Sequence, residues 1–350
     1  MLKTKGFFLA FLLVFGVSQA TFGAEVKLLS LEEALTMGIQ STYEIKMAKL
    51  RLDNASFDYE QNKALNMLTT SKYSELQLEL KLIQAEANYR QTKDKVLFEI
   101  AQKYVEMFKV EQEKRLKSKQ VEIEEKSLRD LEIQVEKGYK TRLELLQQEN
   151  KYHITLLALK KIEDNYQQLT RDFETKIGLE PGELGIELKD IATPTPWSLN
   201  EEEAIVLALK NSLTLQALTL ETELAKIDLE RAKIGPLLAL EQKKLENNLE
   251  LALLNQEQSR AEVKRVVGNQ YASLRQVEEE LALNRTHLEI VKKNYQLVQQ
   301  LQAADLISLL DQISAEVELL QAEYQMRVAI TGFYLEKWKL QQLIGLELEV

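Results

Sequence analysis

The sequence predicts an all-α protein, an elongated antiparallel coiled-coil bundle built from two tandem repeats, with four helical strips in each chain. No proline falls between Lys72 and Gly178, and that stretch is rich in Glu, Lys, Gln and Leu. Only Gly138 interrupts it, which predicts two long helices joined by a tight turn. The chain holds 29% charged and 45% hydrophobic residues but only 12 glycines and 4 prolines, a composition typical of long helices. At about 1.5 Å per residue, a helix over 72–136 would extend roughly 98 Å, which suggests a function that depends on reach.

Residues 1–24 are expected to be a secretory signal peptide. Lys3 and Lys5 precede an apolar run over 6–17, and small and polar residues follow. Cleavage after Ala20 fits the preference for small residues best, with Gly23 or Ala24 as alternatives, and an uncleaved anchor is the other interpretation. No later window reaches ~18 uninterrupted apolar residues. We therefore expect the mature protein to be exported.

The first half of the chain is expected to form four helices. Ser30 is placed to cap the first of them, because Glu33 follows three residues later and completes a capping box. A turn over 66–71 separates the second helix from the third. The expected helices cover residues 31–40, 43–66, 72–136 and 141–177.

The second half repeats this order, which indicates an internal duplication. Matching residues lie 164 to 170 positions apart, as in Ala34 with Ala204, Tyr104 with Tyr271, Leu143 with Ile307 and Ile177 with Ile344. Prolines mark a linker between the copies. We expect a first helical repeat at 25–180, the linker at 181–196 and a second repeat at 197–350, with its longer helices at 237–300 and 305–344.

The last helix carries an apolar stripe with heptad spacing, typical of a helix that packs on a neighbour. The stripe consists of Leu306, Leu310, Ile313, Val317, Leu320, Tyr324, Val328, Leu335 and Trp338. In the first repeat, the helices at 43–66 and 141–177 are together about as long as the one at 72–136. They can therefore stack end to end beside it. Narrow stripes on such strips cannot all be buried in a monomer, so lateral association is expected.

With these features the chain resembles the TolC-like outer-membrane efflux proteins. The resemblance rests on the opening Leu29–Leu35, the duplicated helix plan, the turn over 137–147 and the Ile-Gly-Leu-Glu ending of each copy at 177–180 and 344–347. It implies that three chains form a barrel of twelve helices, a tunnel across the periplasm, and it places the exported protein in the cell envelope, in the outer membrane or the periplasm. It also implies a periplasmic adaptor protein and an inner-membrane transporter as partners, with the hairpin tips docking the adaptor.

The sequence departs from that family in two places. Family members insert a pair of membrane-spanning strands between the shorter and the longer helix of each copy, which needs at least about 20 residues. Here only the turns at 66–71 and 235–236 occupy those places, so the strand insertions are expected to be missing. The second tip, 301–306, also lacks a glycine where the first tip has Gly138.

The candidate site is the pair of hairpin tips, where adaptor docking is expected. Its residues are Gly138, Tyr139, Thr141, Leu143, Ala303, Ala304, Asp305 and Leu306. Gly138 has a purely structural alternative, a turn that needs positive φ. Asp305 has two interpretations, a helix N-cap or, with Asp311, a ring at a tunnel entrance that favours cations. At the opposite end, the loops at 67–68 and 236–238 either contact a membrane or a separate pore, or pack as ordinary loops.

Several function classes are excluded by composition and spacing. The net charge is −10, without a basic block, which argues against nucleic acid. The chain has no cysteine, and His153 and His287 have no second ligand at metal-binding spacing. Acidic runs at 122–125 and 278–280 fit a solvated helix face better than a catalytic pair. We therefore expect no catalytic residues, no cofactor, no metal and no enzymatic activity.

The sequence thus predicts a component of an envelope efflux or secretion conduit, a homotrimeric helical tunnel that works with the adaptor and the inner-membrane pump. The alternative is a structural coiled-coil scaffold of the envelope, derived from the same fold but without a pore.

Overall fold

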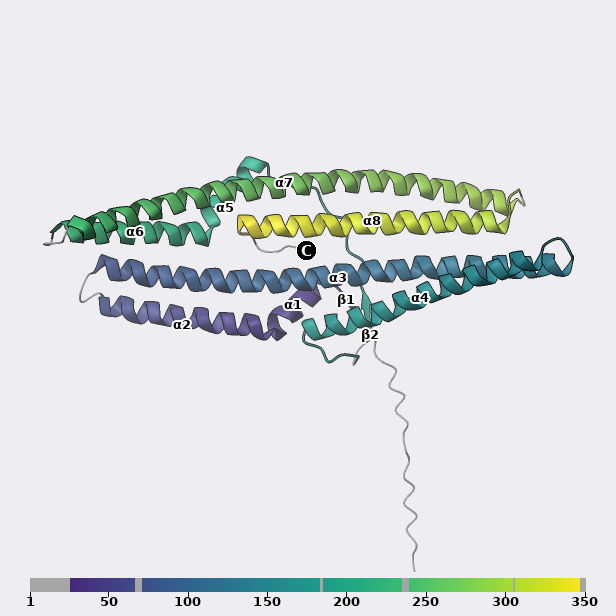
Figure 1. The fold of residues 1–350 in the computed structure, drawn as a ribbon, viewed down its shortest axis with the longest axis horizontal. Helices are drawn as coiled ribbons and strands as arrows, with labels where there is room; N and C mark the ends of the chain where they lie inside the picture. The colour runs from purple at the N-terminus through teal and green to yellow at the C-terminus, as the bar shows by residue number, and fades with distance from the viewer. Residues whose placement is uncertain (1–25, 67–70, 183–184, 235–238, 305, 347–350) are drawn as a thin grey trace, which may run out of the picture.

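The computed structural model describes residues 26–66, 71–182, 185–234, 239–304 and 306–346. The described chain is a long helical bundle with two very short strands, so the predicted all-α class is confirmed (Figure 1). The helices are α1 (Leu31–Ser41), α2 (Tyr43–Asn66), α3 (Lys72–Glu136), α4 (Arg142–Lys176), α5 (Glu201–Asn211), α6 (Leu213–Ile234), α7 (Ala239–Ala303) and α8 (Leu309–Ile344). The strands are β1 (Val26–Leu29) and β2 (Gly185–Leu188).

Side-chain hydrogen bonds cap the N-termini of the two short helices, α1 and α5. The Ser30 side chain accepts a hydrogen bond from the Glu33 backbone N–H at 3.2 Å, and the Glu33 carboxylate accepts one from the Ser30 N–H at 2.8 Å. This confirms the capping box expected before α1. Asn200 and Glu203 form the same pair before α5. The two short helices are therefore started by the same device in each half.

The helices form four strips, as the sequence predicted. Helices α2 and α4 lie end to end along α3, and α6 and α8 lie end to end along α7 (Figure 1). Helix α3 also contacts α6 and α8, so the strips follow the order α7, α6 with α8, α3, α2 with α4. The two outermost strips are α7 on one side and α2 with α4 on the other. Within the described chain, each of them has another strip on one side only. The chain is thus a single layer of helices with two free edges.

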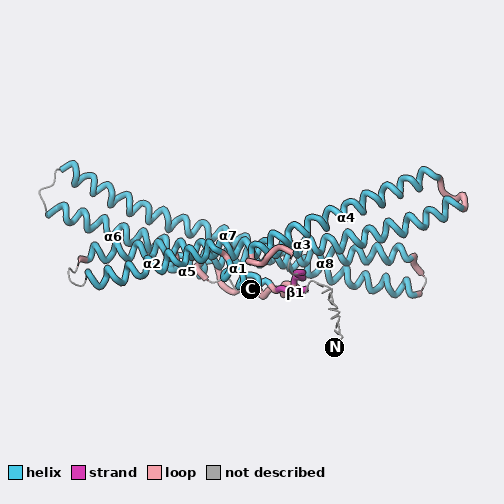
Figure 2. The backbone as a smooth tube through the Cα atoms, turned by 90° about the horizontal axis from the view of Figure 1, so that it is seen from below, coloured by secondary structure: helices cyan, strands magenta, loops and turns pink. Residues whose placement is uncertain are grey.

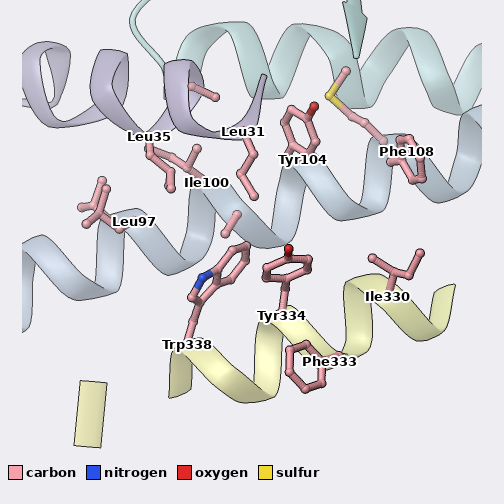
Figure 3. Packing of buried hydrophobic residues seen from close by; sticks show 14 of the residues in the cluster. Leu31, Leu35, Leu97, Ile100, Tyr104, Phe108, Ile330, Phe333, Tyr334 and Trp338 are labelled. Carbon is pink, nitrogen blue, oxygen red and sulfur yellow. The ribbon is translucent and has the colours of Figure 1, made fainter. Parts of the chain in front are cut away.

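The hydrophobic core lies at the middle of the bundle, where the short helices and the strands meet the long ones. Figure 3 shows Tyr334 and Trp338 of α8 pointing toward α3, whereas Tyr104 of α3 points to the opposite side of that helix, toward α1 and the strands. Trp338 and Tyr104 are buried, as is Phe333. This cluster joins the first half of the chain to the second, because α3 and α8 come from different halves.

The stripe expected on the last helix is only partly right. Ile313 and Trp338 are buried, but Leu306 is 69% exposed in the turn before the helix, and Val317, Leu320, Tyr324, Val328 and Leu335 are half-buried. The side chain of Leu310 lies outside the described residues. Instead, α8 buries residues on more than one face, since it contacts α3, α5 and α7. The residues missed by the heptad pattern are Ala315, Ala322, Met326, Ile330, Phe333, Tyr334, Leu340 and Ile344.

Two short strands were not expected from the sequence. Strands β1 and β2 pair in parallel, with Val26 opposite Gly185 and Leu29 opposite Leu188. The Tyr104 hydroxyl lies 3.0 Å from the Leu29 carbonyl oxygen and 2.7 Å from that of Lys189, so its single proton serves both acceptors. Burial raises the pKa of Tyr104, and Asp190 adds to the shift. The linker is thereby held against α3 rather than left as a free connection.

The second half departs from the expected helix bounds. Helix α7 covers Ala239–Ala303 instead of 237–300, and α8 starts at Leu309 instead of Asp305. Ser308 is the N-cap of α8 and pairs with Asp311, so the interpretation of Asp305 as that cap was wrong. The first tip has Thr141 and Glu144 in the same roles, 167 residues earlier. The expected alignment of Leu143 with Ile307, at 164, is therefore shifted by three residues.

The connections at the far end of the bundle are as short as predicted. Five residues separate α2 from α3, and four separate α6 from α7. Residues 67–70 and 235–238 themselves, like residues 1–25, lie outside the described part of the chain. Within the described ranges, no helix combines the length and the apolar character needed to cross a membrane.

Candidate functional site: the hairpin tips

The first tip, residues 137–141, joins α3 to α4 through a well-defined helix-ending turn. The Tyr139 N–H donates to the Gln134 carbonyl at 2.9 Å, and the Gly138 N–H donates to that of Val135 at 3.0 Å. These two bonds constitute a Schellman motif, which ends with a residue in the left-handed region. Gly138 fills that position with φ 76°. A Cβ at Gly138 would meet nothing within 4 Å, so backbone conformation alone requires the glycine.

Charged and polar groups then start α4. Thr141 caps the helix, and the Glu144 carboxylate accepts from the Thr141 N–H at 2.8 Å and from the Lys140 ammonium at 2.7 Å. The hydrogen bond from Lys140, followed by those from Thr141, lowers the pKa of Glu144 to about 2. The tip therefore keeps its capping carboxylate ionised at any physiological pH.

The structure places the second tip at residues 304–308, between the end of α7 and the start of α8, instead of at 301–306. It closes with the same backbone hydrogen bond over five residues, although it has no glycine. The Leu306 N–H donates to the Leu301 carbonyl at 2.9 Å, the counterpart of the bond from Tyr139 to Gln134. Asp305, at the position that corresponds to Gly138, lies outside the described residues. Hydrogen bonds from Ser308 lower the pKa of Asp311, so Asp311 acts here as a capping carboxylate.

The structure places both tips at the same end of the bundle, where α3 meets α4 and α7 meets α8 (Figure 1). Figure 2 shows the two hairpins as separate arms that diverge toward this end. Lys119 of α3 and Glu316 of α8 join the arms below the tips, at 3.1 Å. The candidate residues therefore form two neighbouring surfaces rather than one continuous patch.

The expected tip residues are exposed. Tyr139 is 76% exposed, Leu143 65% and Leu306 69%, and Thr141, Ala303 and Ala304 are exposed as well. None of the three large apolar side chains is covered by the chain itself. Each tip thus presents apolar groups in front of an ionised cap, a surface suited to a protein partner.

The sequence reasoning missed a second set of exposed residues, along the two free edges. Among the described helices, all exposed large hydrophobic residues except Ile133, Val206, Ile234 and Leu343 belong to α2, α4 or α7. Heptad counting could have found them, because Tyr43, Leu50 and Phe57 are seven residues apart, as are Leu283, Ile290 and Leu297. The full set is Tyr43, Met47, Leu50, Phe57 and Leu65 in α2, Leu143, Leu146, Ile154, Leu156 and Leu157 in α4, and Leu240, Leu251, Leu253, Leu254, Leu283, Ile290 and Leu297 in α7.

The polar residues weighed from the sequence are spread over helix surfaces. His153 and His287 are exposed on α4 and α7. Glu122 has its pKa lowered to about 2 by hydrogen bonds from Lys126 and then Lys119. Among the described residues, no group of three or more His, Asp or Glu is arranged to hold a metal ion.

Comparison with solved structures finds the same fold in proteins described as outer-membrane proteins or channels. The outer membrane protein VceC of Vibrio cholerae superposes with a TM-score of 0.63 at 14% identity, over 91% of this chain and 97% of that one. The CmeC outer membrane channel of Campylobacter jejuni gives 0.65 at 8% identity, over 90% and 85%. The MtrE outer membrane channel of Neisseria gonorrhoeae gives 0.62 at 12% identity, over 91% and 89%.

No protein-family model matches the sequence, and no curated protein does. The likeness is therefore one of structure, and it shows that the chain has the TolC-like channel fold. The resemblance inferred from the sequence is confirmed at that level.

Proposed function

We propose that three copies of this chain close into a helical tunnel in the cell envelope, which conducts substrates from an inner-membrane transporter through a periplasmic adaptor. The observation that carries the proposal is the pair of uncovered apolar edges on a single layer of four strips. A layer with two apolar edges exposes apolar surface to water until a partner molecule buries it. Copies of the same layer, joined edge to edge, would cover every edge once the ring closes.

The two edges are suited to each other. Leu283, Ile290 and Leu297 form a stripe on α7, and the opposite edge presents Ile154 and Leu157 of α4. Complete burial of one such side chain contributes about 1.5–3 kcal/mol, so a few of them on each edge are enough to stabilise an interface. The contact is head to tail, with different surfaces on its two sides, and such contacts form rings when the rotation closes.

The solved structures support the tunnel and its place in the envelope. Those with the same fold are described as outer-membrane channels, and four strips per chain in three chains reproduce the twelve-helix plan implied by the sequence resemblance. The exposed apolar side chains at the tips are suited to contact with an adaptor protein.

We further propose that residues 1–24 are a signal peptide. The rest of the chain is proposed to be an internal duplication, with repeats at 25–180 and 197–350 joined by a linker at 181–196. The linker contains β2.

The ring can be tested by disulfide crosslinking, because the natural chain has no cysteine. Ile290 lies 13 residues before the end of α7 and Ile154 lies 12 residues after the start of α4, both about 18–20 Å from the tips. The double variant Ile154→Cys with Ile290→Cys should form covalent dimers and trimers on mild oxidation. Within one chain the two positions lie on opposite edges, so an internal bond is not expected.

The matched control replaces Ile290→Cys by Val206→Cys, since Val206 is 63% exposed on α5, a short helix that belongs to neither edge strip. Light scattering of the natural protein should give three times the chain mass. A monomer in light scattering, with crosslinking no greater than in the control, would contradict the tunnel and favour the structural scaffold.

Adaptor docking at the tips requires a separate test. Tyr139→Asp with Leu306→Asp places charges on both tips without touching a buried residue, and should abolish crosslinking to a co-expressed adaptor while the trimer persists. Val206→Asp, an equal change elsewhere on the surface, should leave crosslinking intact. Unchanged crosslinking in the tip variant would exclude docking there.

A further inference from the structure

The end of the bundle opposite to the tips has a surface that the tunnel does not explain. It is formed by the last turns of α2 and α6 and the first turns of α3 and α7 (Figure 1). The two short links between these helices lie outside the described residues. We call this region the basic end, for its exposed lysines Lys63, Lys72, Lys233, Lys243 and Lys244.

The basic end carries uncovered apolar side chains. Ile234 is 89% exposed and Leu240 83%, the two highest values for any large hydrophobic residue in the described chain. Leu65 is 58% exposed. Ile234 belongs to α6, an inner strip, so edge-to-edge association would not cover it. Another partner is needed at this end.

The two ends of the molecule differ in charge. Residues 63–75 and 233–246 contain five lysines and three glutamates, in a chain whose net charge is −10. Windows of equal length at the tips, 133–145 and 299–312, contain three basic and four acidic residues. Both ends of the bundle expose apolar side chains, but only one end has an excess of basic residues. The difference indicates that the two ends bind partners of different charge.

The lysines are available for binding. Lys72 pairs with Glu75 and Lys243 with Glu246, both at 3.2 Å, yet their side chains remain 65% and 68% exposed. Pairs this exposed are weak, and their ammonium groups can turn to a stronger anion. Helix dipoles favour Lys63 and Lys233 at helix C-termini, but they disfavour Lys72 at the first position of α3. Local helix electrostatics therefore explains only part of the charge.

We propose that the basic end rests on a membrane surface rich in anionic lipid. The five lysines bind headgroup phosphates, and Ile234, Leu240 and Leu65 enter the interface between headgroups and acyl chains. Apolar side chains combined with lysines are what such a surface binds, since burial and attraction to anionic lipids add together. The proposal orients the molecule, with the basic end at the membrane and the tips pointing away from it.

Vesicle flotation of the purified full-length protein tests the proposal. Vesicles of phosphatidylcholine with equimolar phosphatidylglycerol should carry the protein upward at low salt, and phosphatidylcholine alone should carry much less. Lys233→Gln with Lys244→Gln should weaken partition to the anionic vesicles at least about 30-fold. Ile234→Asp should weaken it at least about tenfold, because an apolar contact is lost.

Matched controls separate this surface from general effects. Lys137→Gln with Lys140→Gln removes the same charge at the first tip, and Val206→Asp adds a charge at the middle of the bundle. Both should leave partition unchanged, and circular dichroism should show every variant folded. Flotation does not require a closed ring, so the result is independent of the crosslinking experiment.

Three outcomes would overturn the proposal. Equal flotation with neutral and anionic vesicles would remove the role of the lysines. Equal losses in the basic-end variants and their controls would remove the role of this surface. Binding to native membranes but not to pure lipid would identify a membrane protein, rather than the lipid, as the partner.

Discussion

Two glycines with the same backbone conformation allow a matched test of what holds the ends of the long helices. Gly138 and Gly345 both have φ 76°, so replacing either by alanine places a side chain in the left-handed region. That strain costs about 1–2 kcal/mol at each position. At Gly138 the new Cβ would meet nothing within 4 Å. At Gly345 it would lie 2.6 Å from the Asn211 Cβ, inside normal contact distance.

The surroundings of Gly345 cannot yield easily. The Asn211 side chain donates to the Ile344 carbonyl at 2.9 Å, and Ile344 is buried in the core. Arg90 also donates to the Gly345 carbonyl. Overpacking of this kind adds about 1–3 kcal/mol. We therefore expect Gly345→Ala to lower the free energy of unfolding by about 2–5 kcal/mol and Gly138→Ala by about 1–2 kcal/mol.

Urea denaturation followed by circular dichroism, at one protein concentration for all variants, measures the difference. The slope with urea should stay unchanged, so that the midpoints report stability. Equal losses for the two variants would refute the close packing of the α8 end against α5, and a larger loss for Gly138→Ala would refute the open surroundings of the first tip.

Three further results are expected. Tyr104→Phe should lower the free energy of unfolding by about 1–2 kcal/mol, because a buried hydroxyl shared by two carbonyl groups is lost; urea midpoints unchanged from the natural protein would contradict this. Trp338→Ala should cost about 3–5 kcal/mol in the same assay, and a loss below about 1 kcal/mol would mean that the central core is not packed as described. The lowered pKa of Glu144 means that its stabilising contribution is complete above the ordinary carboxyl pKa and is lost as the pH falls toward about 2; hydrogen-exchange protection factors at the start of α4, which are corrected for the intrinsic effect of pH, should therefore fall over that range in the natural protein but not in Glu144→Gln.

Short-range chemistry explains where sequence reasoning succeeded. The cap at Ser30 depends on Glu33 three residues away, and the end of α3 depends on Gly138 alone. The cap at Ser308 was equally readable, since Asp311 follows at the same spacing, and it was missed because the helix was started too early. Errors of this kind misplace the end of a helix but do not change the prediction that a helix is present.

Contacts between distant residues explain where it failed. Strand β1 is four residues long and pairs with a segment that begins at Gly185, and so short a segment has no pattern of its own. The stripe on α8 described one partner helix, whereas the fold surrounds α8 with three. A periodic pattern shows which side of a helix is apolar, but it does not identify the helix that packs against each side.

The candidate site divides in the same way. That Tyr139 would lie at a turn followed from Gly138, and the structure confirms that turn. Leu306 was expected both at the second tip and at the start of the last helix, and the structure places it in the turn before α8. That α7 and α2 with α4 would be the free edges followed only from the order of the strips. The exposure of Ile234 likewise appears only when α6 is seen to end beside α3 and α7.

Helix propensity, capping and the placement of glycine and proline act over a few residues, and so the sequence by itself determined the helices, their order and their approximate lengths. The order of the strips, the central core between α3 and α8, and the two uncovered edges were decided only by the tertiary structure. The physical reason is that burial is a property of neighbours. Ile290 is apolar in any fold, but it is exposed because α7 is the outermost strip of this one.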